Sequence, residues 1–366
     1  MGLCVGMLTS GGDCQGLNSA MRGVAKRLYE ADRDTRVIGF TDGYAGLMNR
    51  NYREMAYSDF SGILTLGGTI LGTSRQPFKT VNNPLDPEKK DGPTRAEAMI
   101  RTYKELKLDA LVILGGNGSH KTAHMLSERG LNIITLPKTI DNDLAETDMT
   151  FGFQSAVNIA TEVIDGIHTT ATSHGRVFII EIMGHKVGWL TLYAGIAGGA
   201  DVILIPEIPY DPMAIVKAIK KREADRKRFS IIAIAEGAKS KEEAALSKAD
   251  YIARITKSAN LSVAYRLAAL LEKMMVREIR CVVPDHFQSS RTPSAYDRVL
   301  TTALGVKAGD CILSKKFGLM MAVRNNAIVT VPLSEVANKL KAIPADHYLI
   351  ETARKTGIYF GDEKTI

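Results

Sequence analysis

Short apolar segments alternate with longer amphipathic segments along most of the chain, and this alternation limits the possible folds. The apolar runs lie at residues 3–8, 36–40, 108–116, 132–137, 176–184, 201–207, 229–237 and 277–284. Stretches with helical spacing of apolar residues lie between them, for example at 92–106, 154–172 and 212–228. Strands that alternate with helices build parallel sheets covered by helices on both faces. The sequence therefore predicts an α/β protein whose sheets are mainly parallel.

The number of expected strands predicts two lobes. About ten strands are more than one small doubly wound sheet usually holds. A chain of 366 residues is long enough for two medium-sized domains. We expect the break between the lobes near the segment after Asp143.

Composition argues against several classes of protein. The formal charge of +7 is a small surplus of 47 basic over 40 acidic residues, and one Trp gives no sign of an aromatic platform for nucleic acid. No run of about 18 apolar residues predicts a membrane span, and the N-terminus lacks the charged start of a signal peptide. The four cysteines show no CxxC spacing. We therefore expect a cytoplasmic protein that binds neither nucleic acid nor membrane.

Two of the expected strands run directly into a glycine-rich turn that is followed by a helix. The turns are TSGGDCQG at 9–16 and GGNGS at 115–119. Backbone N–H groups at such a helix start can bind a phosphate. Neither turn has the GxxxxGK[ST] or the GxGxxG spacing. Each turn therefore indicates phosphate contact, with a simple strand-to-helix connection as the alternative.

A third expected strand runs into LPKTIDND at 136–143, which places a lysine beside two carboxylates. If the segment stays extended, Asp141 and Asp143 project to the same side. In a phosphoryl-transfer site one such carboxylate accepts the proton of the attacking hydroxyl and the other holds Mg²⁺. Lys138 could then lie by the developing charge of the phosphate. The alternative is a turn in which Asp and Asn bond their own backbone.

Several arginines also lie near expected strand ends. They are Arg75, Arg176, Arg280 and Arg291, with His286 near the last two. Guanidinium groups match phosphate oxygens in geometry and charge. A cluster of this kind is what a phosphorylated sugar requires.

Taken in order, these motifs resemble the A type of the 6-phosphofructokinase family. The motifs that carry the resemblance span essentially the whole chain: TSGGDCQGLN, DGYAGL, GGTILGTSR, GGNGSHKTA, PKTIDND, MGHKVGWL, IPE and TPSAYDR. PKTIDND is the most specific, whereas GGNGS alone also resembles other kinases. The resemblance implies two Rossmann-like lobes, with the active site in the cleft between them. The larger, nucleotide-binding lobe would comprise 1–144 and about 287–340, and the smaller, sugar-phosphate-binding lobe 145–286 and about 341–366.

The resemblance also implies an activity and a set of site residues. The activity is ATP-dependent transfer to the 1-hydroxyl of fructose 6-phosphate, a step of glycolysis, with Mg²⁺ as cofactor. Asp141 would be the general base, with Thr139, Lys138 and Arg75 beside it. The nucleotide site would comprise Gly12, Tyr44, Arg75, Gly116, Asn117, Gly118 and Ser119. The sugar phosphate would be held by Thr139, Asp141, Arg176, Met183, Gly184, His185, Glu207, Arg280, His286 and Arg291, and the metal by Asn117 and Asp143.

In this family, residues at the positions of Arg176 and of the His286 region typically reach the sugar site of a neighbouring subunit. The resemblance therefore implies a homotetramer, or at least a homodimer.

Gly118 bears on the phosphoryl donor. Pyrophosphate-using members typically carry Asp at this position, so Gly118 favours ATP. Lys138 occurs in many pyrophosphate enzymes but also in some that use ATP, and it does not decide the donor.

Three departures from the family pattern leave alternatives open. Asn117 replaces the Asp of GGDGS, His185 replaces the Arg of MGR, and Ser289 replaces the Arg of QRGG. Loss of arginines from the acceptor half keeps two alternatives open: pyrophosphate as donor, or another ketose as acceptor, such as sedoheptulose 7-phosphate or a sulfonated sugar. A further alternative, of another class, is a regulatory nucleotide-binding paralogue. The intact Asp141 and Asp143 argue against it.

Overall fold

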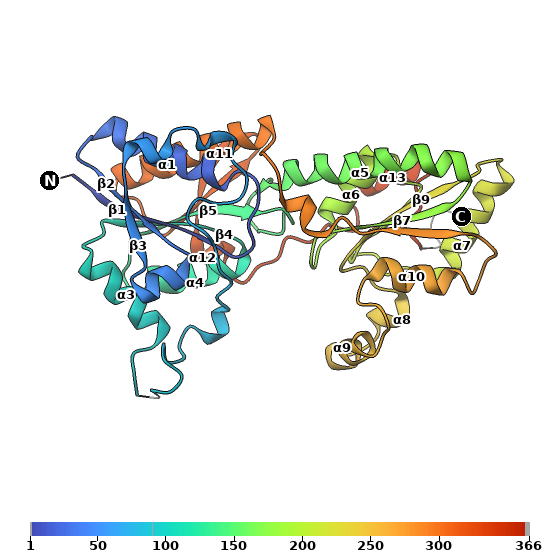
Figure 1. The fold of residues 1–366 in the computed structure, drawn as a ribbon, viewed down its shortest axis with the longest axis horizontal. Helices are drawn as coiled ribbons and strands as arrows, with labels where there is room; N and C mark the ends of the chain where they lie inside the picture. The colour runs from blue at the N-terminus through green and yellow to red at the C-terminus, as the bar shows by residue number, and fades with distance from the viewer. Residues whose placement is uncertain (1, 90, 363–366) are drawn as a thin grey trace. The chain divides into compact units, whose positions relative to one another are not determined.

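The computed structural model describes residues 2–89 and 91–362, which divide into two compact units (Figure 1). Unit 1 comprises 1–155 and 289–340, and unit 2 comprises 156–288 and 341–366. The expected lobes also include residue 1, residue 90 and residues 363–366, which lie outside the described residues. The chain therefore passes between the units at three places, after 155, 288 and 340.

The described part of unit 1 is built on an eight-stranded sheet. Its order is β12 (Ala327–Pro332), β11 (Leu319–Arg324), β5 (Ile133–Thr139), β4 (Ala110–Gly115), β1 (Cys4–Ser10), β2 (Arg36–Phe40) and β3 (Tyr52–Met55), with β6 (Phe151–Gly152) paired to β5. The strands from β11 to β2 are parallel, and only the edge strands β12 and β3 are antiparallel. The central strands are fully buried, as expected for strands covered on both faces.

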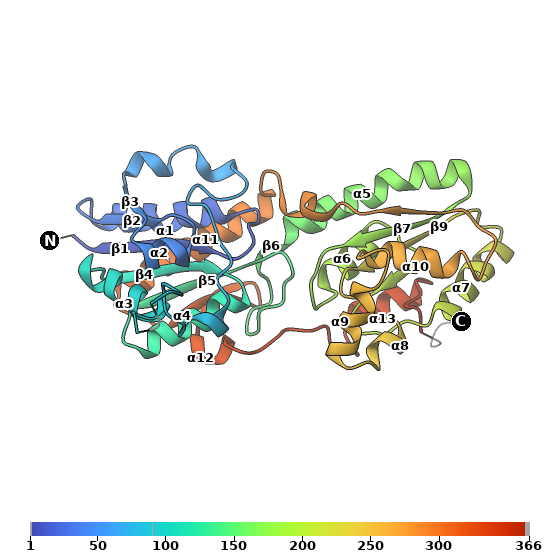
Figure 2. The ribbon, with the colours of Figure 1, turned by 60° about the horizontal axis from the view of Figure 1, so that its bottom comes forward.

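Helices cover both faces of this sheet (Figures 1 and 2). One face carries α1 (Leu17–Ala31) and α11 (Ala295–Leu313). The other carries α2 (Tyr44–Asn49), α3 (Arg95–Glu105), α4 (Asn117–Glu128) and α12 (Leu333–Val336), whose apolar residues share one core with the sheet. Three short 3₁₀ turns lie between β3 and α3: η1 (Tyr57–Phe60), η2 (Ile63–Thr65) and η3 (Phe78–Thr80).

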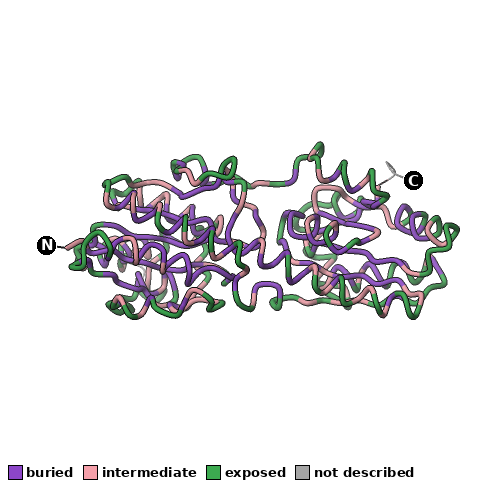
Figure 3. Tube along the Cα trace, turned by 90° about the horizontal axis from the view of Figure 1, so that it is seen from above, coloured by how far each residue is buried: buried purple, intermediate pink, exposed green. Residues whose placement is uncertain are grey.

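The described part of unit 2 has a parallel four-stranded sheet. Its order is β10 (Ile279–Val282), β7 (Val177–Ile182), β9 (Ser230–Ala235) and β8 (Val202–Leu204). The helices α7 (Pro212–Ala224) and α10 (Val263–Leu271) pack on one face through a shared apolar core. The remaining helices are α5 (Phe153–His174), α6 (Trp189–Ala197), α8 (Lys241–Ala244), α9 (Lys248–Thr256) and α13 (Tyr348–Lys355), and the turn η4 is Asp285–Ser289. In both units buried residues, drawn in purple, run through the interior and exposed residues lie mostly at the periphery (Figure 3).

The predicted α/β fold with mainly parallel sheets is confirmed. Each apolar run named above contains a strand, but the 201–207 run yields only the three residues of β8, because Pro206 and the turn after it end the pairing. The antiparallel pair β11–β12 was not expected from the sequence. Its strands are joined through Asn325 and Asn326, which both have positive φ, as a tight hairpin turn requires.

Two glycines let α1 and α11 pack closely in unit 1. A Cβ atom on Gly305 would lie 2.6 Å from the carbonyl oxygen of Ala20 and 2.9 Å from the Cα atom of Gly23. A Cβ atom on Gly23 would lie 2.9 Å from the carbonyl oxygen of Thr302. The two helix backbones therefore touch at a point where no side chain fits, and this contact fixes α11 on the sheet.

We expect Gly305→Ala to lower the free energy of unfolding by about 1–3 kcal/mol, because the new methyl group forces α1 and α11 apart. The matched control is Gly166→Ala, in the exposed middle of α5, where a Cβ atom would meet nothing within 4 Å. That change should raise stability by up to about 1 kcal/mol, the difference in helix propensity. Denaturant unfolding followed by circular dichroism measures both, and equal effects would contradict the close helix contact.

Candidate active site

Three neighbouring strands of unit 1 end at the same edge of the sheet. In the register of β1 with β4, Ser10 lies opposite Gly115, and in that of β4 with β5, Gly115 lies opposite Pro137. The two glycine-rich turns and the segment after Lys138 therefore leave the sheet side by side. Ligands of α/β sheets bind at this carboxyl edge, so the sequence motifs are brought together where a site is expected.

The first glycine turn is held by the segment that carries Arg75. Gly11 has a φ of +92°, its N–H donates to the carbonyl oxygen of Ser74 (3.1 Å), and its own carbonyl accepts from the hydroxyl of Thr73 (2.7 Å). A Cβ atom on Gly12 would lie 3.8 Å from Nη2 of Arg75. The predicted neighbours Gly12 and Arg75 thus lie together, with the guanidinium group over the turn.

The second glycine turn leads directly into α4. Its N-cap residue is Gly116, which has no side chain that could cap the first N–H groups of the helix. Ser119 donates from Oγ to Oγ of Ser10 (2.9 Å) and accepts at its carbonyl from the hydroxyl of Tyr44 (2.8 Å). Gly118 has open space, since a Cβ atom there would meet nothing within 4 Å. The turn is anchored from both sides while its glycine face stays open.

Lys138 is buried between the two turns. Only 5% of its surface is exposed, and its Nζ donates to the carbonyl oxygen of Gly12 (2.6 Å). Burial lowers the pKa of Lys138, whereas the nearby charges of Asp141, Asp143 and Asp13 raise it. A buried ammonium group needs such carboxylates. The lysine therefore ties the first glycine turn to the predicted catalytic carboxylates.

The segment after β5 is a tight loop rather than an extension of the strand. The strand ends at Thr139, and Asn142 has a φ of +52°, so the extended geometry that would have placed Asp141 and Asp143 on one side is not observed. Instead, the N–H of Asp141 donates to Oγ1 of Thr139 (3.1 Å), and Oδ1 of Asn142 accepts from the N–H of Thr150 (3.0 Å). The turn considered as the alternative is thus present, and it still leaves both carboxylates near Lys138.

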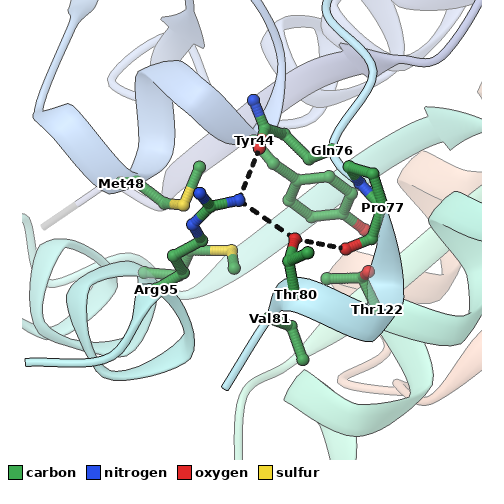
Figure 4. A pocket seen from close by; sticks show the side chains of 9 residues that line it. Tyr44, Met48, Gln76, Pro77, Thr80, Val81, Arg95 and Thr122 are labelled. Carbon is green, nitrogen blue, oxygen red and sulfur yellow. Dashed lines mark hydrogen bonds between the residues drawn. The ribbon is translucent and has the colours of Figure 1, made fainter. Parts of the chain in front are cut away.

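A small hollow adjoins the second glycine turn in unit 1 (Figure 4). Its polar side is organised by Arg95, whose Nη1 donates to Oγ1 of Thr80 (3.0 Å) and to Oε1 of Gln76 (3.4 Å). Tyr44 and Thr122 connect the hollow to α4. The sequence analysis named only Tyr44 among these residues. The others were missed because they come from three separate segments, although the place of Gln76 next to Arg75 was a usable signal.

His120 is a buried histidine in the first turn of α4. Its Nδ1 lies 2.9 Å from the carbonyl oxygen of Gly116, which can only accept, so Nδ1 carries the proton. Nε2 is buried and has no hydrogen-bond partner among the described residues. Burial lowers the pKa of His120 to about 4, so the ring is neutral at pH 7.

In unit 2 a second set of predicted residues gathers at the carboxyl edge of the sheet. Met183, Gly184 and His185 follow β7 directly, and His286 lies in η4 after β10. The turn after β7 is held by Glu236, whose Oε1 accepts from the N–H groups of His185 (2.6 Å) and Gly184 (3.3 Å). Glu236 was not among the residues predicted from the sequence, although it follows an expected strand in the same way as the predicted Glu207.

Glu207, also predicted for the sugar site, has its carboxylate occupied by backbone. Its oxygens accept from the N–H of Gly188 (3.1 Å to each) and from the N–H of Ile343 (3.0 Å). Burial raises the pKa of this carboxyl, and the backbone hydrogen bonds lower it. Because Gly188 is the N-cap of α6, Glu207 holds the start of that helix in place.

Arg176 and Arg280 lie elsewhere in unit 2. Arg176 directly precedes β7, at the amino end of the strand, and its Nε donates to Oε2 of Glu278 (2.5 Å). Arg280, early in β10, bonds the other oxygen of the same carboxylate. Hydrogen bonding to Arg176 lowers the pKa of Glu278. A six-residue strand is about 20 Å long, so one copy of the chain does not bring Arg176 and His185 to the same phosphate.

Ser289 and Arg291 belong to unit 1. Ser289 is buried, whereas Arg291 is exposed and has a φ of +76°. The carbonyl oxygen of Arg291 would lie 2.2 Å from a Cβ atom on Gly67, so the Gly67 turn admits no side chain here. The neighbouring Ser290 carbonyl accepts from Nε2 of Gln15 (2.6 Å), which places this segment along the first glycine turn.

The predicted metal ligands Asn117 and Asp143 are not part of a protein-only metal cage. Among the described residues, no group of three or more His, Cys, Asp or Glu side chains is arranged to hold a metal ion. Mg²⁺ in kinase sites is usually held by one or two carboxylates, substrate phosphates and waters. The oxygen donors at this edge of unit 1, with Asp143 beside Lys138, therefore fit a magnesium ion that arrives with a nucleotide.

The chain is similar to known proteins over nearly its whole length. Residues 4–312 match the family described as phosphofructokinase. The chain is 52% identical to the ATP-dependent 6-phosphofructokinase of Spirochaeta thermophila, covering 98% of this chain and 97% of that one. It is 45% identical to the ATP-dependent 6-phosphofructokinase of Propionibacterium freudenreichii, covering 99% and 100%. The solved pyrophosphate-dependent phosphofructokinase of Marinobacter aquaeolei has a TM-score of 0.80 and covers 98% and 88%, but at 22% identity it supports the fold alone. Among the described helices, none is both long and apolar enough to cross a membrane.

We expect the stability of the protein to fall with acidification because of His120. In the unfolded chain its pKa is about 6.5, so that chain takes up a proton well before the folded protein does. The contribution is complete above pH 6.5 and should decrease by about 2 kcal/mol between pH 7 and pH 5. Denaturant unfolding at both pH values measures it. In His120→Asn, which retains a donor for Gly116, the decrease should be smaller by that amount, and an identical decrease would contradict the neutral buried ring.

Proposed function

Because the chain belongs to the phosphofructokinase family, we propose that it transfers the γ-phosphoryl group of ATP to the 1-hydroxyl of fructose 6-phosphate. The products are fructose 1,6-bisphosphate and ADP, as in glycolysis. The observation that carries the proposal is the meeting of both glycine turns, Lys138 and the Asp141 loop at one sheet edge. The full-length similarity to ATP-dependent 6-phosphofructokinases supports the same donor and acceptor.

ATP would bind along the second glycine turn. The open space at Gly118 and the uncapped start of α4 leave room and N–H groups for phosphates. Arg75, over the first turn, would contact the same phosphate chain.

Asp141 would act as the general base. It accepts the proton of the 1-hydroxyl while the new O–P bond forms and the bond from the γ-phosphorus to ADP breaks. The hydrogen bond from its N–H to Thr139 orients the loop, and the Lys138 ammonium group lies where it can stabilise phosphate charge. Asp143 and Asn117 would hold Mg²⁺ together with the nucleotide, and the ion would supply positive charge to the phosphate oxygens.

The sugar phosphate would use residues from two copies of the chain. The His286 region was expected to reach a neighbouring site, but His286 lies in η4, after β10, at the carboxyl edge that also carries His185. We therefore propose that Met183, Gly184, His185 and His286 serve the copy's own site. Arg176 and Arg280, at the amino end of the sheet, would serve the site of a neighbouring subunit. We therefore propose a homotetramer, or at least a homodimer. We also propose a cytoplasmic location, in keeping with the four free cysteines.

The proposal is tested with purified protein and Mg²⁺. We expect phosphorylation of fructose 6-phosphate with ATP, measured through coupled ADP release, and weaker use of sedoheptulose 7-phosphate. Asp141→Asn should lower kcat by about 10²–10⁴-fold, the typical contribution of a general base, with KM for ATP little changed. Asp148→Asn is the matched control, since that carboxylate lies in the same loop and accepts from the N–H of Asn325 (2.7 Å). No turnover of fructose 6-phosphate would contradict the proposed function. A fully active Asp141→Asn variant would contradict the assignment of Asp141 as the general base.

Gly118→Asp tests the nucleotide site. The side chain has room in the protein itself, so the fold should be unchanged. Its charge would face the phosphates, and like charges in contact cost several kcal/mol, so KM for ATP should rise at least about tenfold. Gly118→Asn supplies the same size without the charge and should raise KM much less. If both variants keep the KM of the parent protein, the nucleotide does not pass Gly118.

A further inference from the structure

Asp297 is a carboxylate buried without exposed surface at the start of α11. Its Oδ1 accepts from the N–H of Gly152 (3.0 Å), and its Oδ2 accepts from the N–H (2.8 Å) and the hydroxyl (2.5 Å) of Ser155. All three donors belong to the segment from β6 into the first turn of α5. A carboxylate at that place also interacts favourably with the helix dipole. Asp297 therefore holds β6 and the start of α5 against α11.

The segment held by Asp297 is the one that supports the proposed catalytic loop. In the pairing of β5 with β6, Lys138 lies opposite Phe151 and Thr139 lies opposite Gly152. The preceding residue, Thr150, donates from Oγ1 to the carbonyl oxygen of Thr139 (2.7 Å) and from its N–H to Asn142. The loop that carries Asp141 is thus closed at its base by residues 150–152. A strand of two residues has little stability of its own, so it depends on the anchor behind it.

The same segment supports the first glycine turn. Sγ of Cys14 donates to the carbonyl oxygen of Phe151 (3.7 Å). Gly152 has a φ of +91°, and a Cβ atom there would lie 2.6 Å from Sγ of Cys14. The short strand β6 therefore lies against both loops that Lys138 connects. A shift of β6 would move the Asp141 loop relative to the first turn.

The anchor itself is rigid. The N–H of Asp297 is capped by Oγ of Ser294 (3.2 Å), and its carbonyl oxygen accepts from the hydroxyl of Thr301 (2.6 Å). That hydroxyl also lies 2.7 Å from Oγ of Ser19 on α1. Together with the close helix contact at Gly305, these bonds fix Asp297 to the helix pair on one face of the sheet.

We propose that Asp297 is a positioning residue for the reaction, which acts through β6 to set the place of Asp141. This inference rests on the proposed function. A carboxylate suits the position because the backbone N–H groups of Gly152 and Ser155 can only donate, and an amide would direct its own NH₂ at one of them. The second glycine turn, where ATP would bind, is anchored instead through Ser10 and Tyr44.

The test is Asp297→Asn in the full-length protein with ATP, Mg²⁺ and fructose 6-phosphate. We expect kcat to fall by about 10–100-fold, the effect of a displacement near 1 Å, while KM for ATP changes less than about threefold. In the Asp141→Asn background, Asp297→Asn should lower kcat little further, because the base that Asp297 positions has already been removed. A folded Asp297→Asn protein with unchanged kcat would overturn the proposal, and so would losses that multiply in the double variant.

Asp201→Asn is the matched control. Asp201 is also a carboxyl whose pKa burial raises, it accepts a backbone N–H from Ile231 (2.8 Å), and it pairs with Arg222 in unit 2. Asp201→Asn should lower the melting temperature but leave kcat unchanged. If it lowers kcat as much as Asp297→Asn does, the effect of Asp297 is one of general stability, and the proposal is overturned. If Asp297→Asn does not fold, Ser155→Ala decides, since it removes one of the three donors: a severalfold lower kcat supports the proposal and an unchanged kcat overturns it. An inactive parent protein would instead refute the proposed function.

Discussion

The parallel pairing of β1, β4 and β5 is the constraint on which the site in unit 1 depends. Because Ser10, Gly115 and Pro137 lie side by side in the register, three loops leave the sheet at one place. Glycines in the turns after β1 and β4 let a phosphate chain approach the backbone closely. A slip of one residue in any of these strands would turn its buried side chains to the other face. The full burial of the three strands thus fixes the geometry of the loops.

Lys138 shows how this edge combines stability with chemistry. Its ammonium group is buried, a costly arrangement that depends on the carbonyl of Gly12 and on the carboxylates around it. The same groups are those that a phosphoryl transfer would use. Asp297 accepts hydrogen bonds from Gly152, Ser155 and Ser294 and connects β6 to the helix pair α1 and α11. The proposed catalytic loop therefore depends on the buried Lys138 and, through β6, on the buried Asp297.

Much of the fold and part of the candidate site followed from local patterns. The apolar runs indicated the strands because a strand covered on both faces is apolar at nearly every position. Glycines and carboxylates at the strand ends marked Gly12, Gly116 and Asp141, since the carboxyl edge of a parallel sheet gathers such residues. The patterns failed where the geometry is not local. The extended conformation considered for residues 141–143 is replaced by a turn because Asn142 adopts a left-handed conformation and bonds Thr150.

By itself, the sequence determined the fold class, the order of the strand-end motifs and the family resemblance, because these depend on periodicity and on residues close together in the chain. Only the tertiary structure decided which of the named residues meet. It joined Arg75 to the first glycine turn, bound both oxygens of Glu207 to backbone N–H groups, and placed Arg176 at the end of β7 opposite to His185. It also revealed Asp297, whose partners lie some 140 positions away in the chain. Such contacts arise from the packing of whole helices and sheets, which no local pattern records.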